Sequence, residues 1–304
     1  QTLARRPPPP ADLVVIDECH HAIADSYARL WEKYPKALFL GVSATPIRLS
    51  GQGFADLFEV LIPSPQIKWF IAEGYLVPIK YFVGVSLNVE RVKVQMGDYS
   101  LKQLGQAIKT LPSLVGNLVA SYQKHAWGKS MIVFGVDVAH SKDIAARYNE
   151  YGIPAAHIDA TTPARERQMI LQQFEAKEIW VLCNAEIVIE GFNFPACEVI
   201  QLARPTKSLV LALQMIGRVT RPFEGKKYGI VLDHAGLWQE HGLPTMDREW
   251  TLQGATKLKP TAMAIQSPEI EEGELLEISP KTRRELIESL DAELMEVTPE
   301  LETL

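Results

Sequence analysis

The feature that most constrains the fold of this chain is a regular alternation of short apolar runs, rich in Val and Ile, with longer stretches of helical period. Short apolar runs bounded by turn residues are typical of buried strands, and amphipathic stretches between them are typical of crossover helices. Together they predict an α/β fold with parallel sheets. The predicted buried strands are 13–17, 37–43, 131–135, 155–159, 179–183, 199–203 and 228–233, and the predicted helices are 22–34, 139–151, 163–177 and 208–220.

The positions of these strands along the chain indicate two sheets. The first is incomplete, because few strands precede an interruption at 87–111, whereas the second extends over about 130–233. We therefore expect two parallel-sheet domains in tandem, the first truncated at its amino end. The predicted division is 1–86 for the first domain, 87–128 for a linker with connecting helices, 129–236 for the second domain and 237–304 for a carboxy-terminal extension.

Two further elements are predicted outside the sheets. In the linker, apolar and polar residues alternate over 91–96 before Gly97, a pattern that favours a hairpin or flap. In the extension, Ser279 and Pro280 supply an N-cap and a first-turn proline for a helix that ends near residue 296.

Composition and charge exclude some classes of protein. No apolar stretch approaches the length that crosses a bilayer, and the three cysteines, Cys19, Cys183 and Cys197, have the spacing of neither a disulfide framework nor a zinc site. We therefore expect a cytoplasmic, reducing setting with no membrane association.

Charge is divided unevenly along the chain. Of the 31 basic and 37 acidic residues, 3 and 12 lie in 267–304, which leaves 28 and 25 in the first 266 residues. The body is therefore mildly basic, which permits binding to nucleic acid without demonstrating it. The acidic tail is a candidate contact for a protein partner, although a solvated extension is the commoner role of such a segment.

The strongest candidate for a catalytic segment is LVVIDECH, 13–20, an apolar strand that ends in two carboxylates. Such a strand delivers its last side chains to the carboxyl edge of a sheet, where ligands bind in open α/β folds. Phosphoryl transfer needs one carboxylate to hold Mg²⁺, often through water, and another to orient or deprotonate the attacking water. Asp17 and Glu18 suit these two tasks, and His20 can relay between the nucleotide and a neighbouring segment. The alternative is a helix whose first turn is acidic because the helix dipole favours acids there.

A second predicted strand, in ALFLGVSATP at 37–46, ends in the hydroxyl residues Ser43 and Thr45. Hydroxyl groups at this edge of a sheet can bond the acidic pair at the end of the neighbouring strand and sense the state of a nucleotide. The alternative is an ordinary strand-to-turn transition that Pro46 closes.

The segment QMIGRVTRP, 214–222, places Gln214, Arg218 and Arg221 at spacings of four and three, which is one face of a helix. Two arginines presented from a different domain are the expected form of an arginine finger, which stabilises charge that develops on a γ-phosphate. A solvated basic helix end is the alternative, but it does not explain Gly217, which helix propensity disfavours.

These segments together resemble motifs of DExH-type superfamily 2 helicases. LVVIDECH resembles motif II, VSATP motif III and QMIGRVTRP motif VI, while NAEIVIEGFNFP at 184–195 is similar to motif V. IVFGVDVAHSKDIA at 132–145 resembles motif IV, and IDATTPARER at 158–167 resembles the segment that follows it. The resemblance is closest to bacterial and phage DEAD/DEAH-box proteins grouped with XPB-like helicases and type III restriction subunits.

The resemblance implies two RecA-like domains that bind ATP and Mg²⁺ between them. Asp17 and Glu18 would lie on one side of the nucleotide, with Mg²⁺ held through water, and Arg218 and Arg221 on the other, assisted by His20 and Gln214. Gly191 and Asn193 are implied to lie near the nucleotide. The residues implied to couple the nucleotide to nucleic acid are Ser43, Thr45, Thr161, Arg167 and Glu190.

The partner that the resemblance implies is nucleic acid, with DNA preferred over RNA and contacts made to its backbone. Motif V departs from the family pattern at two positions. Ile189 stands where the family has Thr, so one hydrogen bond to a phosphate is missing, and Asn193 stands where it has Asp, so a charge is missing. Coupling between ATP and nucleic acid is therefore expected to be weaker than in typical members.

No segment of the chain fits a phosphate-binding loop. Gly128, Lys129 and Ser130 resemble the end of one, but Gln123 stands where an earlier Gly is required, and the segment precedes a strand instead of following one. In the family this loop lies well before the acidic pair, and only sixteen residues precede Asp17. We therefore expect a fragment of an ATP-dependent helicase or translocase that is inactive alone. The alternatives are the motor subunit of a restriction-type enzyme and a non-hydrolysing remnant that binds nucleic acid.

Overall fold

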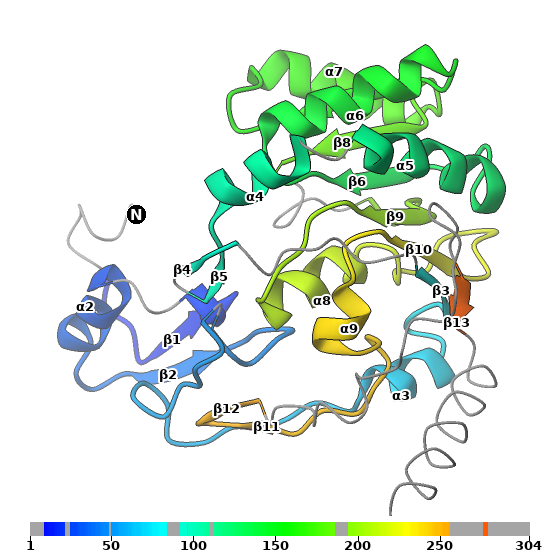
Figure 1. Ribbon diagram of the computed structural model, residues 1–304. Helices are drawn as coiled ribbons and strands as arrows, with labels where there is room; N and C mark the ends of the chain where they lie inside the picture. Colours follow the sequence, from blue (N-terminus) through cyan, green and yellow to red (C-terminus); the bar gives the residue numbers. More distant parts are fainter. Residues whose placement is uncertain are drawn as a thin grey trace, which may run out of the picture.

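The computed structural model describes residues 9–21, 25–48, 50–83, 92–95, 97–109, 112–185, 194–255 and 276–278. All seven predicted strands and all four predicted helices are present, which confirms the α/β fold (Figure 1). The strands are β1 (Leu13–Ile16), β2 (Leu38–Gly41), β3 (Ile79–Val83), β4 (Val94–Gln95), β5 (Asp98–Tyr99), β6 (Met131–Phe134), β7 (Ala155–Ile158), β8 (Val181–Asn184), β9 (Val199–Leu202), β10 (Gly229–Asp233), β11 (Trp250–Thr251), β12 (Gly254–Ala255) and β13 (Leu276–Ile278). The helices are α2 (Asp25–Lys33), α3 (Ile67–Ala72), α4 (Leu101–Lys109), α5 (Pro112–His125), α6 (Val138–Glu150), α7 (Ala164–Glu175), α8 (Leu209–Gly217) and α9 (Leu237–His241), with a short 3-10 helix at Cys19–His21.

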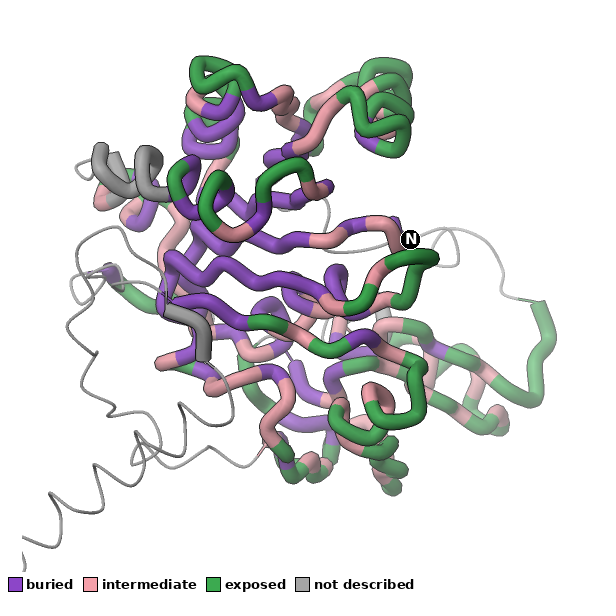
Figure 2. Tube along the Cα trace, turned by 90° about the vertical axis from the view of Figure 1, so that its right-hand side faces the viewer, coloured by how far each residue is buried: buried purple, intermediate pink, exposed green. Residues whose placement is uncertain are grey.

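The larger sheet has the strand order β13-β3-β10-β9-β6-β8-β7 among the described residues. Its strands run parallel except β13, which pairs antiparallel to β3. Strands β6, β8, β9 and β10 are buried along their whole length, which explains why their sequences are mainly apolar (Figure 2). Helices α5 and α6 pack on one face of this sheet, and α7, α8 and α9 pack on the other.

Strand β3 is a member of the larger sheet that the sequence did not predict. It pairs in parallel with β10, and the Tyr81 hydroxyl donates a hydrogen bond to Asp233 Oδ2 at 2.9 Å. Asp233 is fully buried and also accepts the backbone N–H groups of Ala235 and Trp238, and this burial raises its pKa. Residues that we placed in the first domain, 1–86, therefore supply a strand to a sheet that we expected to begin at residue 129. The division into domains remains a prediction.

The smaller sheet consists of β1 and β2, paired in parallel from Leu13 and Leu38 onward. One face is covered, because Trp31 of α2 stacks on Phe39 with ring centroids 4.2 Å apart. We predicted buried strands here, and this prediction is wrong for the other face. Its exposed side chains are Leu13 (54%), Val15 (56%), Leu38 (74%) and Leu40 (47%). Side chains alternate between the two faces of a strand, and no helix among the described residues covers the second face.

The hairpin predicted before Gly97 is confirmed, because β4 and β5 pair antiparallel and Gly97 has a φ of +89°. Asp98 in this hairpin accepts a hydrogen bond from the Thr206 hydroxyl at 2.8 Å and one from the Lys207 backbone N–H at 2.7 Å. The hairpin is thus attached to the loop that precedes α8.

The predicted helix between Ser279 and residue 296 lies outside the described residues. Within the part of the chain that is described, no helix has both the length and the apolar character needed to span a membrane.

We expect stability to fall as the pH drops below about 6.5, the ordinary pKa of histidine. Burial lowers the pKa of His234 to about 3 and also lowers those of His140 and His241. The unfolded chain therefore takes up protons that the folded chain excludes, so stability is fully present above about pH 6.5 and is lost below it. The melting temperature should decrease between about pH 7.5 and about pH 5. The decrease should be smaller for His234→Gln, and equal slopes for the two proteins would contradict this assignment.

Candidate functional site

The two carboxylates predicted to hold Mg²⁺ lie directly after β1, where the chain turns into the 3-10 helix. Asp17 is exposed, and its Oδ1 accepts the backbone N–H of Glu18 at 2.8 Å. Glu18 has a φ of +50°, a left-handed conformation that is uncommon outside glycine and that recurs at functional sites. The Glu18 side chain is 45% exposed. Both carboxylates can therefore reach solvent, and a pair of accessible carboxylates suits Mg²⁺ that keeps most of its water ligands.

His20 joins three of the predicted segments. Its side chain is fully buried, with Nδ1 lying 3.0 Å from Ser43 Oγ and 3.3 Å from Glu18 Oε2. On the other side of the ring, Nε2 lies 3.0 Å from Nε2 of Gln214 on α8, a residue 194 positions away in the sequence. The structure thus brings the acidic segment, the serine after β2 and the predicted arginine-bearing helix into one hydrogen-bonded cluster.

The hydrogen bonds around Ser43 indicate the tautomer of His20. Ser43 Oγ donates to the Thr45 carbonyl at 2.9 Å, so its single proton is used, and it accepts the Thr45 backbone N–H at 3.1 Å. Ser43 must then accept from His20, which places a proton on Nδ1 and leaves Nε2 free to accept from the Gln214 amide. This tautomer of the imidazole gives each of its two ring nitrogens a hydrogen-bond partner.

The hydroxyl of Thr45 does not take part in this cluster. Thr45 is 2% exposed, and its Oγ1 is buried without a hydrogen-bond partner among the described residues. Of the two hydroxyl side chains predicted to lie at this sheet edge, only that of Ser43 bonds His20 in the structure. A buried hydroxyl without a partner is uncommon in native proteins.

The predicted helix that carries Gln214 and the two arginines ends earlier than expected. Helix α8 begins at the N-cap Ser208 and ends at Gly217, so the predicted helix 208–220 is too long. Arg218 is the C-cap residue and is 9% exposed, whereas Arg221 lies beyond the helix and is half-buried. The early end has a physical cause, because Gly217 has low helix propensity and the Thr220 hydroxyl donates to the Gly217 carbonyl at 2.9 Å. Arg221 therefore does not share a helical face with Gln214.

Thr161 and Arg167 lie after β7, at the edge of the larger sheet, and organise a turn there. Asp159 Oδ1 accepts the Thr161 hydroxyl at 2.6 Å and its backbone N–H at 2.7 Å. Arg167 donates to the carbonyl groups of Asp159 at 3.1 Å and Thr162 at 3.2 Å. The hydroxyl proton of Thr161 is thus used within the turn. Hydrogen bonds from His157 and Thr161 hold the pKa of Asp159 well below its ordinary value.

Sequence reasoning missed the residues that support this turn. His157 Nδ1 lies 2.7 Å from Ser141 Oγ, and His157 Nε2 lies 2.9 Å from Asp159 Oδ2. The available signal was a histidine and an aspartate two residues apart at the end of an apolar run. Ser141 is fully buried, so this serine, histidine and aspartate support the fold and are not a hydrolase triad. The motif V residues Ile189, Glu190, Gly191 and Asn193 lie outside the described residues.

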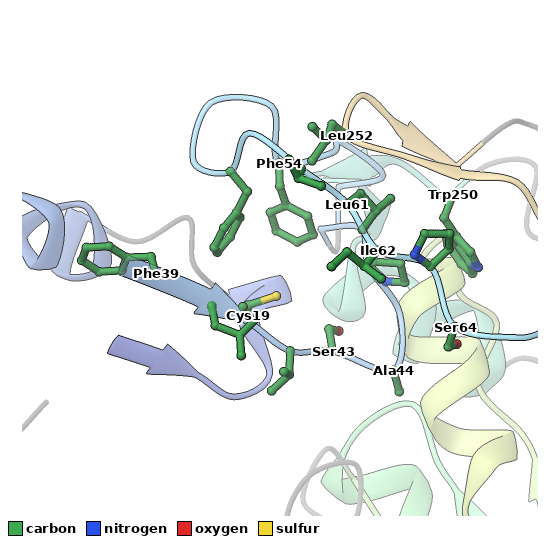
Figure 3. A pocket seen from close by; sticks show the side chains of 17 residues that line it. Cys19, Phe39, Ser43, Ala44, Phe54, Leu61, Ile62, Ser64, Trp250 and Leu252 are labelled. Atoms are coloured by element: carbon green, nitrogen blue, oxygen red, sulfur yellow. The ribbon is translucent and has the colours of Figure 1, made fainter. Parts of the chain in front are cut away.

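Two other features of the structure are poorly suited to hold phosphate. Lys129, in the segment that resembles the end of a phosphate-binding loop, pairs with Glu198 at 2.8 Å, and Gly128 forms a turn with a φ of +74° before β6. A cavity of about 310 Å³ lies beside β2, lined mainly by apolar side chains (Figure 3). Labelled residues that line it include Cys19, Phe39, Phe54, Leu61, Ile62, Trp250 and Leu252. Such a lining does not suit a triphosphate.

Two family models match this chain. The model described as "Type III restriction enzyme, res subunit" matches residues 4–48, which include the acidic segment and Ser43. The model described as "Helicase conserved C-terminal domain" matches residues 107–222, which include α8 and both arginines. The two matches relate the chain to the superfamily 2 helicases and, among them, to the type III restriction subunits.

The curated relatives that this chain matches are longer than the chain itself. A 51.5 kDa protein of Lactococcus phage (isolate 7-9) is 36% identical over 257 residues, which are 84% of this chain and 56% of that protein. A Saccharomyces cerevisiae protein described as an ATP-dependent helicase, IRC3, is 29% identical over 234 residues, which are 74% of this chain and 34% of that protein. The chain thus spans between about a third and just over half of the length of these relatives.

Among solved structures, a fragment described as the HsdR subunit of a type I restriction enzyme from Vibrio vulnificus YJ016 superimposes with a TM-score of 0.58 at 21% identity. The superposition covers 77% of this chain and 45% of that structure. At this identity the likeness shows the fold, and it confirms the RecA-like α/β architecture that the motifs implied.

We expect His20 and Gln214 to be energetically coupled. Replacing either residue by Ala leaves a polar group of the other without its partner, which costs about 1 to 3 kcal/mol when that group is buried. A double-mutant cycle on the free energy of unfolding should give a coupling of about 0.5 to 3 kcal/mol. The exposed pair Arg147 and Glu150, 2.8 Å apart, serves as the control, for which a coupling below about 1 kcal/mol is expected. Additive losses for His20 and Gln214 would show that the contact is not formed.

Proposed function

We propose that this chain is the nucleic-acid motor part of an ATP-dependent superfamily 2 helicase or translocase. The observation that carries the proposal is the 3.0 Å contact between His20 of the acidic segment and Gln214 of α8. This contact connects the smaller sheet, after which Asp17 and Glu18 follow, with the helix whose C-cap is Arg218. A nucleotide held between these elements would be sensed from both sides.

The proposed chemistry divides among the residues as follows. Asp17 holds Mg²⁺ through water, and Glu18 orients or deprotonates the attacking water. When bound, Mg²⁺ would neutralise charge on the phosphate oxygens. Arg218 and Arg221 stabilise the charge that develops on the transferred phosphoryl group. His20 transmits the state of this site to Ser43 on one side and Gln214 on the other.

We propose nucleic acid as the partner, with DNA favoured over RNA and contacts made through the phosphate backbone. The support is the helicase relatives and the mildly basic body of the chain. Closure of the two sheets on ATP and opening after hydrolysis would shift them along one nucleic-acid strand.

Ile189 and Asn193 support weak coupling between ATP and nucleic acid. Thr161 and Arg167 would act by shaping the turn after β7, because the Thr161 hydroxyl and Arg167 Nη2 are bonded within it.

A second candidate is the motor subunit of a restriction-type enzyme. It is favoured by the match of residues 4–48 to the restriction res-subunit model. This candidate differs from the first by its need for a nuclease partner, and the acidic tail is the proposed contact for a protein partner. For either candidate we propose a cytoplasmic location, supported by three buried cysteines that are free of disulfides.

In a form of the protein that contains a phosphate-binding loop, Glu18→Gln and Arg218→Ala should each lower ATP turnover by on the order of 10³-fold. Glu18→Gln removes the base while keeping the size of the side chain, and Arg218→Ala removes a positive charge. Lys36→Ala is the control, because Lys36 is exposed on the turn before β2. Turnover at the parent rate in either variant would remove that residue from the mechanism and favour the non-hydrolysing alternative.

The 304 residues alone should show negligible ATP turnover, with or without DNA, because they contain no phosphate-binding loop. The measurement is phosphate release at saturating ATP, with the loop-containing form as the positive control. Brisk turnover by the 304 residues would mean that other residues hold the β- and γ-phosphates.

A further inference from the structure

The chain returns to the smaller sheet after α9. We call residues 243–255 the strap, the smaller sheet with α2 and residues 50–62 the first lobe, and the larger sheet with its helices the second lobe. The strap contains the short hairpin of β11 and β12, which lies beside the segment that follows β2 (Figure 1). It begins beyond residue 222, where the match to the helicase carboxy-terminal model ends.

The strap is bonded to the first lobe through its backbone. The N–H groups of Phe54 and Ala55 donate to the Leu252 carbonyl at 2.7 and 2.9 Å, and the N–H of Gly53 donates to the Gln253 carbonyl at 3.1 Å. The Leu252 side chain packs in the small core of the first lobe (Figure 3). The strap therefore contributes both hydrogen bonds and apolar contact to this lobe.

Arg248 attaches the strap to the second lobe. Its side chain is buried, and its guanidinium donates to the carbonyl groups of His241 at 2.9 Å and Leu243 at 3.2 Å, at the carboxyl end of α9. The backbone of Arg248 is held by Gln66, which accepts the N–H at 3.2 Å and donates to the carbonyl at 2.9 Å. Gln66 is the N-cap of α3, in the segment that joins the two lobes. A single residue thus links α9 with the interlobe segment.

These attachments are made by other residues than the contact between His20 and Gln214, although Leu252 shares the small core of the first lobe with Cys19, the neighbour of His20. The lobes are consequently connected at two places, by the buried histidine at the end of α8 and by the strap beyond α9. A second connection, made by other residues, adds a restraint on how far the two lobes can move apart.

We propose that the strap is a positioning element, which holds the lobes at the separation where Gln214 reaches His20. Arg248 and Gln66 are its positioning residues, and neither touches the reacting atoms. The restraint on the lobes stands on the contacts above, whereas its effect on ATP turnover rests on the proposed function. A purely structural role for the strap would stabilise the first lobe without changing the distance between the lobes.

Gly53→Ala is the variant that tests the strap most directly. A Cβ at this position would lie 2.0 Å from the Leu252 carbonyl oxygen and 2.5 Å from the Gly254 backbone nitrogen, so the strap must move away. Gly53 is outside the left-handed region of φ, so the substitution acts through this contact and not through backbone strain. Gln66→Glu is the second variant, because it removes the donor to the Arg248 carbonyl and leaves the size of the side chain unchanged.

Lys68→Ala, on α3, is the matched control, because it removes another side-chain contact to the strap. Lys68 pairs with Asp247 at 3.1 Å, but the two side chains are 58% and 64% exposed. Water and salt screen such a pair, so its removal should not release the strap.

The measurement is the distance between spin labels on the first and second lobes of the 304-residue chain, by pulsed electron paramagnetic resonance. Lys36→Cys and Lys142→Cys place labels at exposed positions, and the native cysteines are buried. We expect one narrow distribution for the parent and for Lys68→Ala. Gly53→Ala and Gln66→Glu should give longer and broader distributions, with secondary structure retained by circular dichroism. An unchanged distribution in folded Gly53→Ala overturns the proposal; if that variant does not fold, Gln66→Glu decides it in the same way.

Turnover in the loop-containing form tests the catalytic consequence. Gly53→Ala should lower kcat by on the order of 10²-fold, as expected for a small displacement of catalytic groups, with a smaller effect on KM. If the strap acts through Gln214, the double variant Gly53→Ala/Gln214→Ala should be no slower than Gln214→Ala. If the losses of turnover in the two single variants multiply in the double variant, the strap does not act through Gln214. A parent without ATP turnover would contradict the proposed function, and the label distances would still decide whether the strap restrains the lobes.

Discussion

The arrangement of this chain depends on one buried imidazole. His20 has no access to water, so each of its nitrogen atoms must find a partner within the protein. Ser43 meets this need within the first lobe and Gln214 meets it from the second. Because an unsatisfied buried nitrogen costs free energy, the contact between the lobes is built into the folding of the acidic segment itself. The same constraint makes His20 suited to transmit a change at Glu18 to α8.

The two lobes differ in how completely they bury their strands. The larger sheet is covered by helices on both faces, and α8 packs on one of these faces. The smaller sheet has two strands, a covered face and an exposed apolar face. Part of its core is supplied from far along the chain, by Leu252 of the strap. Packing of the first lobe is thus tied to the position of the second.

Much of the site could be predicted from the sequence. Asp17 and Glu18 follow an apolar run, and Ser43 follows another, so the carboxyl edge of a parallel sheet was the expected place for them. Arg218 and Arg221 were expected on a single helical face, but the helix stops at Gly217. Local spacing could not show this, because the residue at which a helix ends depends on the capping hydrogen bonds that form around its last turn. The partners of Thr161 also could not be predicted, since they depend on how a turn closes.

What the sequence by itself determined is the fold class, the order of seven strands and four helices, and the residue types at the candidate site. These follow from periodicity and from side-chain chemistry, which are local properties of the chain. Only the tertiary structure decided that β3 joins the larger sheet, that His20 meets Gln214 and that the strap returns to Gly53. Each of these is a pairing between residues far apart in sequence. Such pairings depend on the shape and packing of whole elements, which no short pattern encodes.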